Sequence, residues 1–192
     1  MKADYRKVLL TGGFWNQKED LNRGVTLPAV YDRFEETGRI KAFNCQWKEG
    51  MPYKPHCYWD SDVYKWIEGA AYSLYREDDP ELRAKVEAII DQIGLNQGDD
   101  GYFNIYFTVV DPKARFTNRD YCELYCAGHM IEAAVAYYEA TGRDRLLKIA
   151  ERYAGYKGCV HGRYSRSASR FQDSGTSGDR TRPYPSVSLH RQ

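Results

Sequence analysis

The chain has 192 residues, a formal net charge of +1 and five cysteines, a length that suits one domain or part of a larger one. Its balanced charge gives no argument for nucleic acid as a partner, and no apolar run approaches the roughly 20 residues that cross a bilayer. The cysteines follow no disulfide or zinc-ribbon spacing and no apolar leader opens the chain, which together predict a reducing cytoplasm.

The first third of the chain predicts mixed local structure. Residues 7–13 (KVLLTGG) predict a short strand that ends in a glycine turn. Residues 14–39 predict a helix with a break near 24–28, where a glycine and a proline occur. Residues 41–59 contain three helix breakers among aromatic residues, so we expect an irregular connection of the kind that often carries function.

A helical hairpin follows. Residues 60–76 predict a helix with its N-cap among Asp60, Ser61 and Asp62. Its expected buried stripe consists of Val63, Trp66, Ile67, Ala70, Ala71 and Leu74. After a proline, residues 81–93 predict a second helix. Its buried side is expected at Leu82, Val86, Ile89, Ile90 and Ile93.

The same hairpin recurs further along the chain. Residues 67–89 align without a gap with residues 131–153, which pairs Glu68 with Glu132. Two helical hairpins at a fixed period predict a repeat architecture in which each hairpin buries its face on the next. The predicted fold class is therefore all-α, a partial α/α toroid with a short N-terminal strand. Between the hairpins, residues 104–110 (NIYFTVV) predict another short strand.

The segment YCELYCAGHMIEAA, residues 121–134, raises a question of chemistry. In a helix, Cys122, Cys126 and His129 would share one face. These side chains could bind a soft metal or supply a nucleophile. Buried thiols among small residues are also typical of a packed helix, and no further ligand lies at a zinc-site spacing. The packed helix is the favoured interpretation, and the metal site stays open.

Two compositional features leave further alternatives. Aromatic residues make up 15% of the chain, with 17 Tyr, which suits either a cleft that stacks on sugars or a Tyr-rich helical core. Residues 157–192 contain 7 Ser, 6 Arg and 4 Gly but no Ile. This composition predicts a disordered tail or an out-of-frame reading, and it sets the predicted boundary between residues 1–156 and 157–192.

Several motifs together resemble a known family. They are GGFW (12–15), LPAVYDRFEETGRI (27–40), WDSDVYKWIEGAAYSL (59–74), DPEL (79–82), QGDDGYFN (97–104) and ELYCAGHMIEAAVAYYEATG (123–142). In this order they closely resemble glycoside hydrolase family 127, the β-L-arabinofuranosidases. The resemblance covers residues 7–156. It implies an (α/α)6 barrel followed by β-sandwich domains, of which this chain holds the opening part.

The resemblance also implies a reaction. Family members hydrolyse non-reducing terminal β-L-arabinofuranosides with retention, using a cysteine thiolate near a zinc ion with Cys and Glu ligands, and a glutamate as general acid/base. It places all of these groups beyond this chain, so no residue of the chain is expected to be catalytic or to bind zinc, and the chain alone is expected to be inactive. The implied partner is an arabinose-containing oligosaccharide or glycan, and the full-length protein is expected to be a homodimer.

Within the chain, the resemblance assigns substrate binding to eight positions: Asn44, Gln46, Trp59, Asp60, Asp62, Cys122, Glu123 and His129. Cys122 stands where the family usually has a histidine that hydrogen-bonds the sugar, and a thiol is a poorer hydrogen-bonding group. Asp60 and Asp62 could instead cap a helix, and His129 could be a buried core residue. Asp100 is expected to organise its loop.

Other functional classes remain open from the sequence. One is a non-catalytic α/α-repeat module that binds carbohydrate through its loops. Another is metal binding by Cys122, Cys126 and His129. A related toroid with different chemistry is a third, although the motifs around residues 59–66 and 123–129 do not suggest it.

Overall fold

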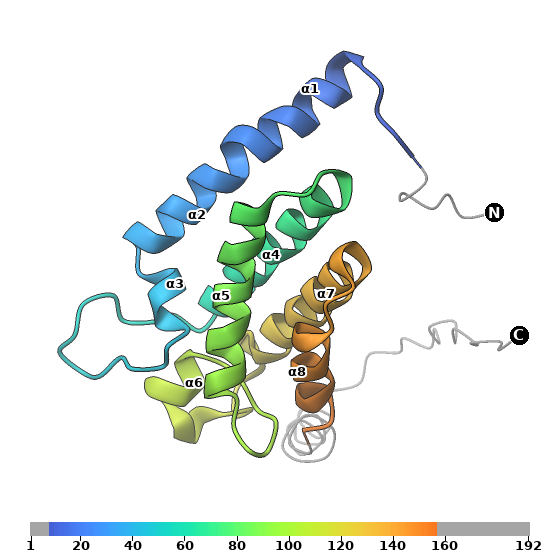
Figure 1. Ribbon diagram of the computed structural model, residues 1–192. Coiled ribbons are helices and arrows are strands. Elements are labelled where there is room, and N and C mark those ends of the chain that lie inside the picture. The colour runs from blue at the N-terminus through green and yellow to red at the C-terminus, as the bar shows by residue number, and fades with distance from the viewer. Residues whose placement is uncertain (1–7, 157–192) are drawn as a thin grey trace, which may run out of the picture.

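The computed structural model describes residues 8–156, which fold into helices joined by loops and short turns (Figure 1). Helices α1 (Gly13–Leu21) and α2 (Leu27–Glu36) form one rod through a π-helical turn, Asn22–Thr26. The short helix α3 (Arg39–Ala42) ends this part.

Two helical hairpins make up the rest and lie side by side (Figure 1). The first consists of α4 (Trp59–Arg76) and α5 (Pro80–Asn96), and the second of α7 (Glu123–Thr141) and α8 (Arg145–Ala154). Between them lie α6 (Tyr106–Val109) and the 3-10 turns Pro112–Ala114 and Arg119–Tyr121. The predicted all-α class and the repeated hairpin are confirmed.

The two predicted strands are wrong within the part of the chain that the structure describes. Residues 8–12 lead into α1 without forming a strand, and Lys7 lies outside the described residues. A strand needs a neighbouring strand to bond its backbone groups, and residues 8–156 contain none. In the second predicted strand, residues 104–110, Asp60 Oδ2 accepts the Ile105 N–H at 3.0 Å and Asn104 Oδ1 accepts the Phe107 N–H at 3.1 Å. These bonds position the start of the short helix α6, which forms in place of a strand.

The predicted helix break near residues 24–28 is a π-helical turn. Pro28 lies in the first turn of α2, where its missing N–H removes no required hydrogen bond. The wider π turn before it changes the local bonding pattern without interrupting the rod. The rod is tied to α4 by Trp66, whose Nε1–H donates to the buried carbonyl oxygen of Leu27 at 2.9 Å.

The first turn of α4 also differs from the prediction. Tyr58 is the N-cap, so Asp60, Ser61 and Asp62 lie inside the helix and none of them caps it. The carboxylates of Asp60 and Asp62 are used by other segments of the chain, which explains the error. The predicted start of α5 is confirmed, because the helix begins at Pro80. Asp79 is its N-cap and accepts hydrogen bonds from the N–H groups of Glu81 and Leu82.

The hydrophobic core lies between the hairpins. Every predicted stripe residue of α4 and α5 is at most 8% exposed, which confirms both stripes. The most extensive packing joins α4 to α7. Small residues meet in this interface, with Ala70 and Ala71 on α4 and Ala133 and Ala134 on α7 all fully buried, so the two backbones can approach closely.

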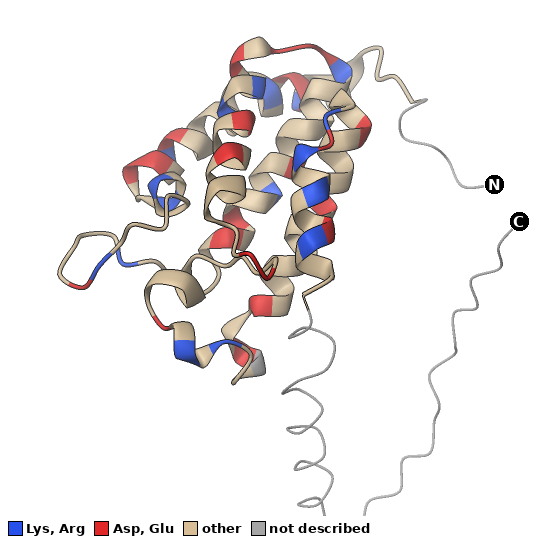
Figure 2. Ribbon diagram, turned by 60° about the horizontal axis from the view of Figure 1, so that its bottom comes forward, with Lys and Arg blue, Asp and Glu red and all other residues tan. Residues whose placement is uncertain are grey.

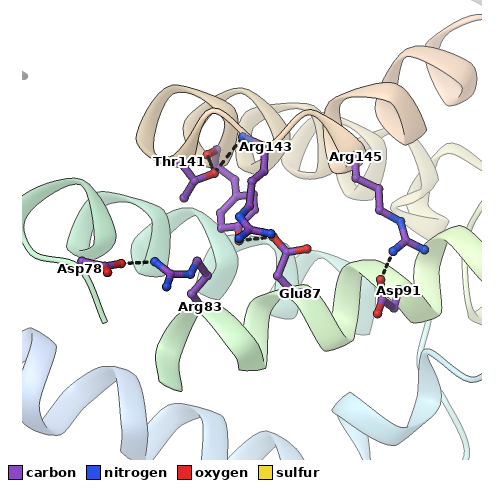
Figure 3. Close-up of polar contacts among 8 residues, drawn as sticks. Asp78, Arg83, Glu87, Asp91, Thr141, Arg143 and Arg145 are labelled. Atoms are coloured by element: carbon purple, nitrogen blue, oxygen red, sulfur yellow. Dashed lines mark hydrogen bonds and ion pairs between the residues drawn. The ribbon is translucent and has the colours of Figure 1, made fainter. Parts of the chain in front are cut away.

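Polar contacts join the outer helices. Figure 3 shows Arg145 at the start of α8 pairing with Asp91 of α5, and Arg143 reaching Glu87 at 3.6 Å. These pairs are partly exposed, so each contributes at most about 1 kcal/mol. Lys and Arg alternate with Asp and Glu over the described helices (Figure 2), which agrees with the near-neutral charge. None of the helices in residues 8–156 has the length and apolarity that crossing a membrane requires.

The loop after α5 is fixed onto α8. Gln97 Nε2 donates to the carbonyl oxygens of Gly101 at 2.8 Å and Ile149 at 2.9 Å. Asp100 Oδ1 accepts the Tyr102 N–H at 3.0 Å, so the expected loop-organising bond of Asp100 is present. Gly101 has a φ of +87°, and a Cβ there would lie 2.4 Å from the Arg152 carbonyl oxygen. Both the turn and the close approach require glycine.

Asp60 forms a buried link between α4 and the loop before α6. Its side chain is 0% exposed, and only Oδ2 has a hydrogen-bond partner, the Ile105 N–H. Burial raises the pKa of Asp60 to about 7, although the hydrogen bond from Ile105 opposes the shift. A carboxyl group with this pKa is partly protonated near neutrality.

The packing of α4 on α7 predicts different losses of stability at two equivalent positions of the repeat. Ile67 is 0% exposed and Ile131 is 41% exposed. We expect Ile67→Ala to lower the free energy of unfolding by about 2–5 kcal/mol, because it removes buried methyl groups and leaves a cavity. Ile131→Ala is the matched control and should change it by no more than about 0.5 kcal/mol. Urea unfolding followed by circular dichroism measures both, and equal losses would contradict the assigned packing.

The raised pKa of Asp60 predicts how the stability of the fold depends on pH. Its pKa is near 3.8 when unfolded and about 7 when folded, so between these values the folded state holds more protons. Stability contributed by this group therefore falls as pH rises from about 4 to 7, with a limiting slope of about 1.4 kcal/mol per pH unit. Asp60→Asn should remove this slope, whereas Asp99→Asn, at an exposed loop position, should retain it. Urea unfolding across this range would refute the assignment if wild type and Asp60→Asn showed parallel curves.

Candidate functional site

Two parts of the chain that are far apart in the sequence meet at the N-terminal ends of α4 and α7. One is the loop at residues 43–58 with the first turn of α4 that follows it, and the other is the turn before α7. The side chains of Cys57 and Cys122 are neighbours, and Cys126 Sγ donates to the Cys57 carbonyl oxygen at 3.5 Å. Asp60 is close enough for its charge to act on Cys45 and Cys126. The fold thus brings most of the predicted sugar-binding segments to one place.

Cys122 occupies a special backbone position. Its φ is 60°, in the left-handed region, and it is the residue before the first residue of α7. Such a conformation is uncommon for a residue with a side chain. The half-buried thiol points back to the Asp120 carbonyl oxygen, 3.6 Å from Sγ. Cys122 therefore precedes the helical face that holds Cys126 and His129, and the predicted common row is wrong at its first member.

The neighbouring thiols are protonated at neutral pH. Burial raises the pKa of Cys45 to about 12, with a smaller contribution from the charge of Asp60. Burial also raises the pKa of Cys57 and of Cys126. Because the thiolate is the reactive form, these three side chains act as packed, weakly polar groups. This favours the packed-helix interpretation for Cys126.

Glu123 holds the connection between α6 and α7. It is 1% exposed, and its two oxygens accept hydrogen bonds from the Tyr102 hydroxyl at 2.6 Å and the Phe116 N–H at 2.5 Å. Burial raises the pKa of Glu123, while both hydrogen bonds and the charge of Arg115 lower it. The Arg115 guanidinium lies over the Tyr102 ring, 4.0 Å from its centroid. Glu123 therefore fixes the base of the turn that carries Cys122.

The remaining predicted residues near this end are more accessible. Asn44 Oδ1 accepts the backbone N–H of Gln46 at 2.9 Å. Asn44 is half-buried, and Gln46 is exposed. Trp59 is half-buried beneath the Arg39 guanidinium, which lies 5.0 Å from its ring centroid. The same guanidinium donates through Nε to Asp62 Oδ2 at 3.2 Å. Arg39 is thus a site neighbour for which the sequence offered no signal.

His129 belongs to a different cluster. It lies about two helical turns beyond Cys122, with Nδ1 3.0 Å from Glu132 Oε2. Together with Glu68 on α4 these residues form a group whose ligand atoms all lie within 4.8 Å of one another, a possible metal-binding group. Glu68 and Glu132 were not predicted from the sequence as members of such a group. Two features of the sequence could have indicated them, namely their equivalent positions in the repeat and the three-residue spacing from His129 to Glu132.

The zinc site implied by the family resemblance has Cys and Glu ligands, and the described residues do not fit it. Cys57, Cys122 and Cys126 are neighbours, but no set of three close Cys, His, Asp or Glu ligand atoms within residues 8–156 includes a thiol. The predicted set of Cys122, Cys126 and His129 is likewise not brought together. The one set of donors that gathers in this part of the chain contains only nitrogen and oxygen.

Comparisons with known proteins agree with the motifs. The chain matches the family model for the β-L-arabinofuranosidase GH127 catalytic domain over residues 7–177. Over 101 residues it is 40% identical to a non-reducing end β-L-arabinofuranosidase of Bifidobacterium longum subsp. longum, a match that covers 50% of this chain and 15% of that protein. The matched family region extends past Tyr156, where we expected the resemblance to end.

Solved structures show the same relationship. A GH127 β-L-arabinofuranosidase from Geobacillus stearothermophilus superposes with a TM-score of 0.75 and 40% identity, covering 82% of this chain and 26% of that one. A second GH127 β-arabinofuranosidase superposes with a TM-score of 0.71 and 34% identity, covering 81% of this chain and 26% of that one. The chain thus spans about a quarter of the length of these solved relatives. By its motifs, its helical hairpins and its family match, the chain belongs to the GH127 catalytic-domain family of β-L-arabinofuranosidases.

Proposed function

We propose that the protein is a glycoside hydrolase that releases non-reducing terminal β-L-arabinofuranose from an arabinose-containing glycan with retention. In this proposal the present chain supplies part of the substrate-binding wall. The observation that carries it is the convergence of the loop at residues 44–46, the start of α4 and the turn at Cys122, in a chain that belongs to GH127. Sugar sites commonly gather where such loops meet a rigid helical scaffold.

The site residues divide by their accessibility. We assign direct sugar contact to the accessible side chains of Asn44, Gln46, Trp59 and Cys122, which offer amide groups, an aromatic face and a thiol. Asp60 and Glu123 are buried and hydrogen-bond other parts of the chain, so we assign them the positioning of the loops that carry these contacts.

The other two predicted residues lie apart from these contacts. Asp62 is engaged by Arg39, and its part in the proposal is to set the Arg39 guanidinium over Trp59. His129 lies farther along α7, beside Glu132, and we assign it no contact with the terminal sugar.

The proposal for the catalytic groups rests on the family match and on the arrangement of the described thiols. We place the thiolate nucleophile, its zinc ion and the general acid/base outside residues 8–156, because the described thiols do not form a zinc-binding set. The part of the described residues in the reaction is to bind and position the sugar. The proposed compartment is the cytoplasm, which suits four free cysteines in the described residues, and the proposed assembly of the whole protein is a homodimer.

Cys122 provides the test. Where the family usually has an imidazole, Cys122→His should strengthen binding of methyl β-L-arabinofuranoside about fivefold, the equivalent of one net hydrogen bond of about 1 kcal/mol. Leu95→His, at a position 73% exposed on α5, adds an imidazole elsewhere and should leave affinity unchanged. Saturation-transfer NMR and calorimetric titration measure the affinities.

The same samples test catalysis. We expect the 192-residue chain to bind the sugar without hydrolysing p-nitrophenyl β-L-arabinofuranoside. Turnover by this chain would contradict the placement of the catalytic groups. Absence of sugar binding by both wild type and Cys122→His would contradict the proposed wall. If longer products of the gene bound the sugar and still gave no turnover, the non-catalytic carbohydrate-binding module would replace the hydrolase.

A further inference from the structure

A cluster of nitrogen and oxygen ligands crosses the interface between α4 and α7. Glu68 comes from α4, and His129 and Glu132 come from α7. One ligand atom from each lies within 4.8 Å of the other two. Nothing in the proposed glycosidase reaction uses this cluster, which contains no thiol and so differs from the zinc site implied by the family.

The fold brings these residues together for a specific reason. His129 and Glu132 are three residues apart, so they lie on the same side of α7. Glu68 and Glu132 are 64 residues apart, at equivalent positions of the two hairpins. Because α4 packs along α7, the equivalent glutamates meet across the interface. The repeat therefore places two carboxylates together, and His129 adds an imidazole beside them.

Neighbouring aromatic residues hold the ligands in position. The Tyr125 ring meets the His129 ring edge to face, with centroids 4.5 Å apart, which restricts the imidazole plane. The Tyr72 hydroxyl donates to Glu68 Oε1 at 2.9 Å, a bond that orients a carboxylate in the way that outer-shell groups orient metal ligands. Tyr125 and Tyr72 thus hold His129 and Glu68, the two less exposed ligands, in position.

The charges in the cluster are not balanced by lysine or arginine. Within residues 8–156 neither Glu68 nor Glu132 pairs with either kind of side chain. Lys65 lies three residues before Glu68 on α4, but its ammonium lies over the Tyr125 ring, 5.0 Å from the centroid, and 4.0 Å from Asp62. Two carboxylates this close repel each other, and a cation between them would remove the repulsion.

The contact between His129 and Glu132 has the spacing of two ligands of one ion. His129 Nδ1 is a buried atom in ion-pair contact with Glu132 Oε2 at 3.0 Å, but the contact lacks the alignment of a hydrogen bond. Donors that bind one transition metal ion at about 2.0–2.2 Å are themselves about 3–3.5 Å apart. An ion bound by both atoms would satisfy the buried nitrogen.

We propose that Glu68, His129 and Glu132 form a binding site for a first-row divalent transition metal ion. One imidazole and two carboxylates are ligands that suit Zn²⁺, Co²⁺ or Mn²⁺, whereas Mg²⁺ and Ca²⁺ prefer oxygen alone. Three protein ligands leave the remaining positions to water. The bound ion joins α4 to α7, and it stabilises the folded chain because the unfolded chain does not assemble the three ligands. This proposal does not rest on the proposed function.

Cobalt titration of the purified, metal-free 192-residue chain tests the site. We expect one equivalent of Co²⁺ to bind, with weak visible bands of nitrogen and oxygen coordination and no intense near-ultraviolet band from sulfur. Glu132→Gln and His129→Ala should each weaken binding at least about tenfold. Glu132 is 61% exposed, so its substitution should leave the fold intact, as far-ultraviolet circular dichroism will check. Glu49→Gln, at an exposed loop position, is the control and should bind like wild type.

Two results would overturn the proposal. One is unchanged cobalt affinity in both Glu132→Gln and His129→Ala. The other is a sulfur band whose loss follows Cys122→Ser or Cys126→Ser, since the ion would then bind to the thiols. Thermal unfolding gives a second measurement, because Zn²⁺ should raise the Tm of wild type and Glu49→Gln but not that of Glu132→Gln.

Discussion

The close packing of α4 on α7 is the constraint on which the other features of this structure depend. Paired alanines on both helices remove the bulk that would hold the backbones apart, and Ile67 on α4 and Met130 on α7 are fully buried as well. Because both helices are fixed along their length, their N-terminal ends are fixed as well. The first turn of α4 and the turn before α7 therefore come together without any direct link between them in the sequence.

Buried carboxylates convert this packing into a defined arrangement of loops. Asp60 binds the backbone before α6, and Glu123 binds both Tyr102 and the Phe116 backbone. Burying an acidic group is costly unless it is hydrogen-bonded or neutralised. The raised pKa of each carboxyl reflects that cost. The loops next to the proposed sugar site are thus held by buried carboxylates, whereas the side chains assigned to sugar contact remain accessible.

The structure also separates two kinds of metal-binding chemistry that the sequence placed on one helix. Cys126 and Cys57 lie near the N-terminal end of α7, where burial raises the pKa of both thiols. His129 faces Glu68 and Glu132 instead. A soft thiolate site and a harder nitrogen and oxygen site are therefore different places on this chain. This explains why the segment that first suggested an active site does not act as one unit.

The sequence alone determined the helical class, the repeated hairpin and the family, because hydrophobic periodicity and ordered motifs are local properties of the chain. Both buried stripes of the first hairpin followed from spacing. Tertiary structure decided the roles of Asp60, Glu123 and Glu68, and it turned residues 104–110 from an expected strand into a helical turn. The physical reason is that an acidic side chain can cap a helix, accept a distant N–H or bind a cation with equal chemical ease. Which of these it does depends on the partner that the packed helices bring within about 3 Å of its oxygens.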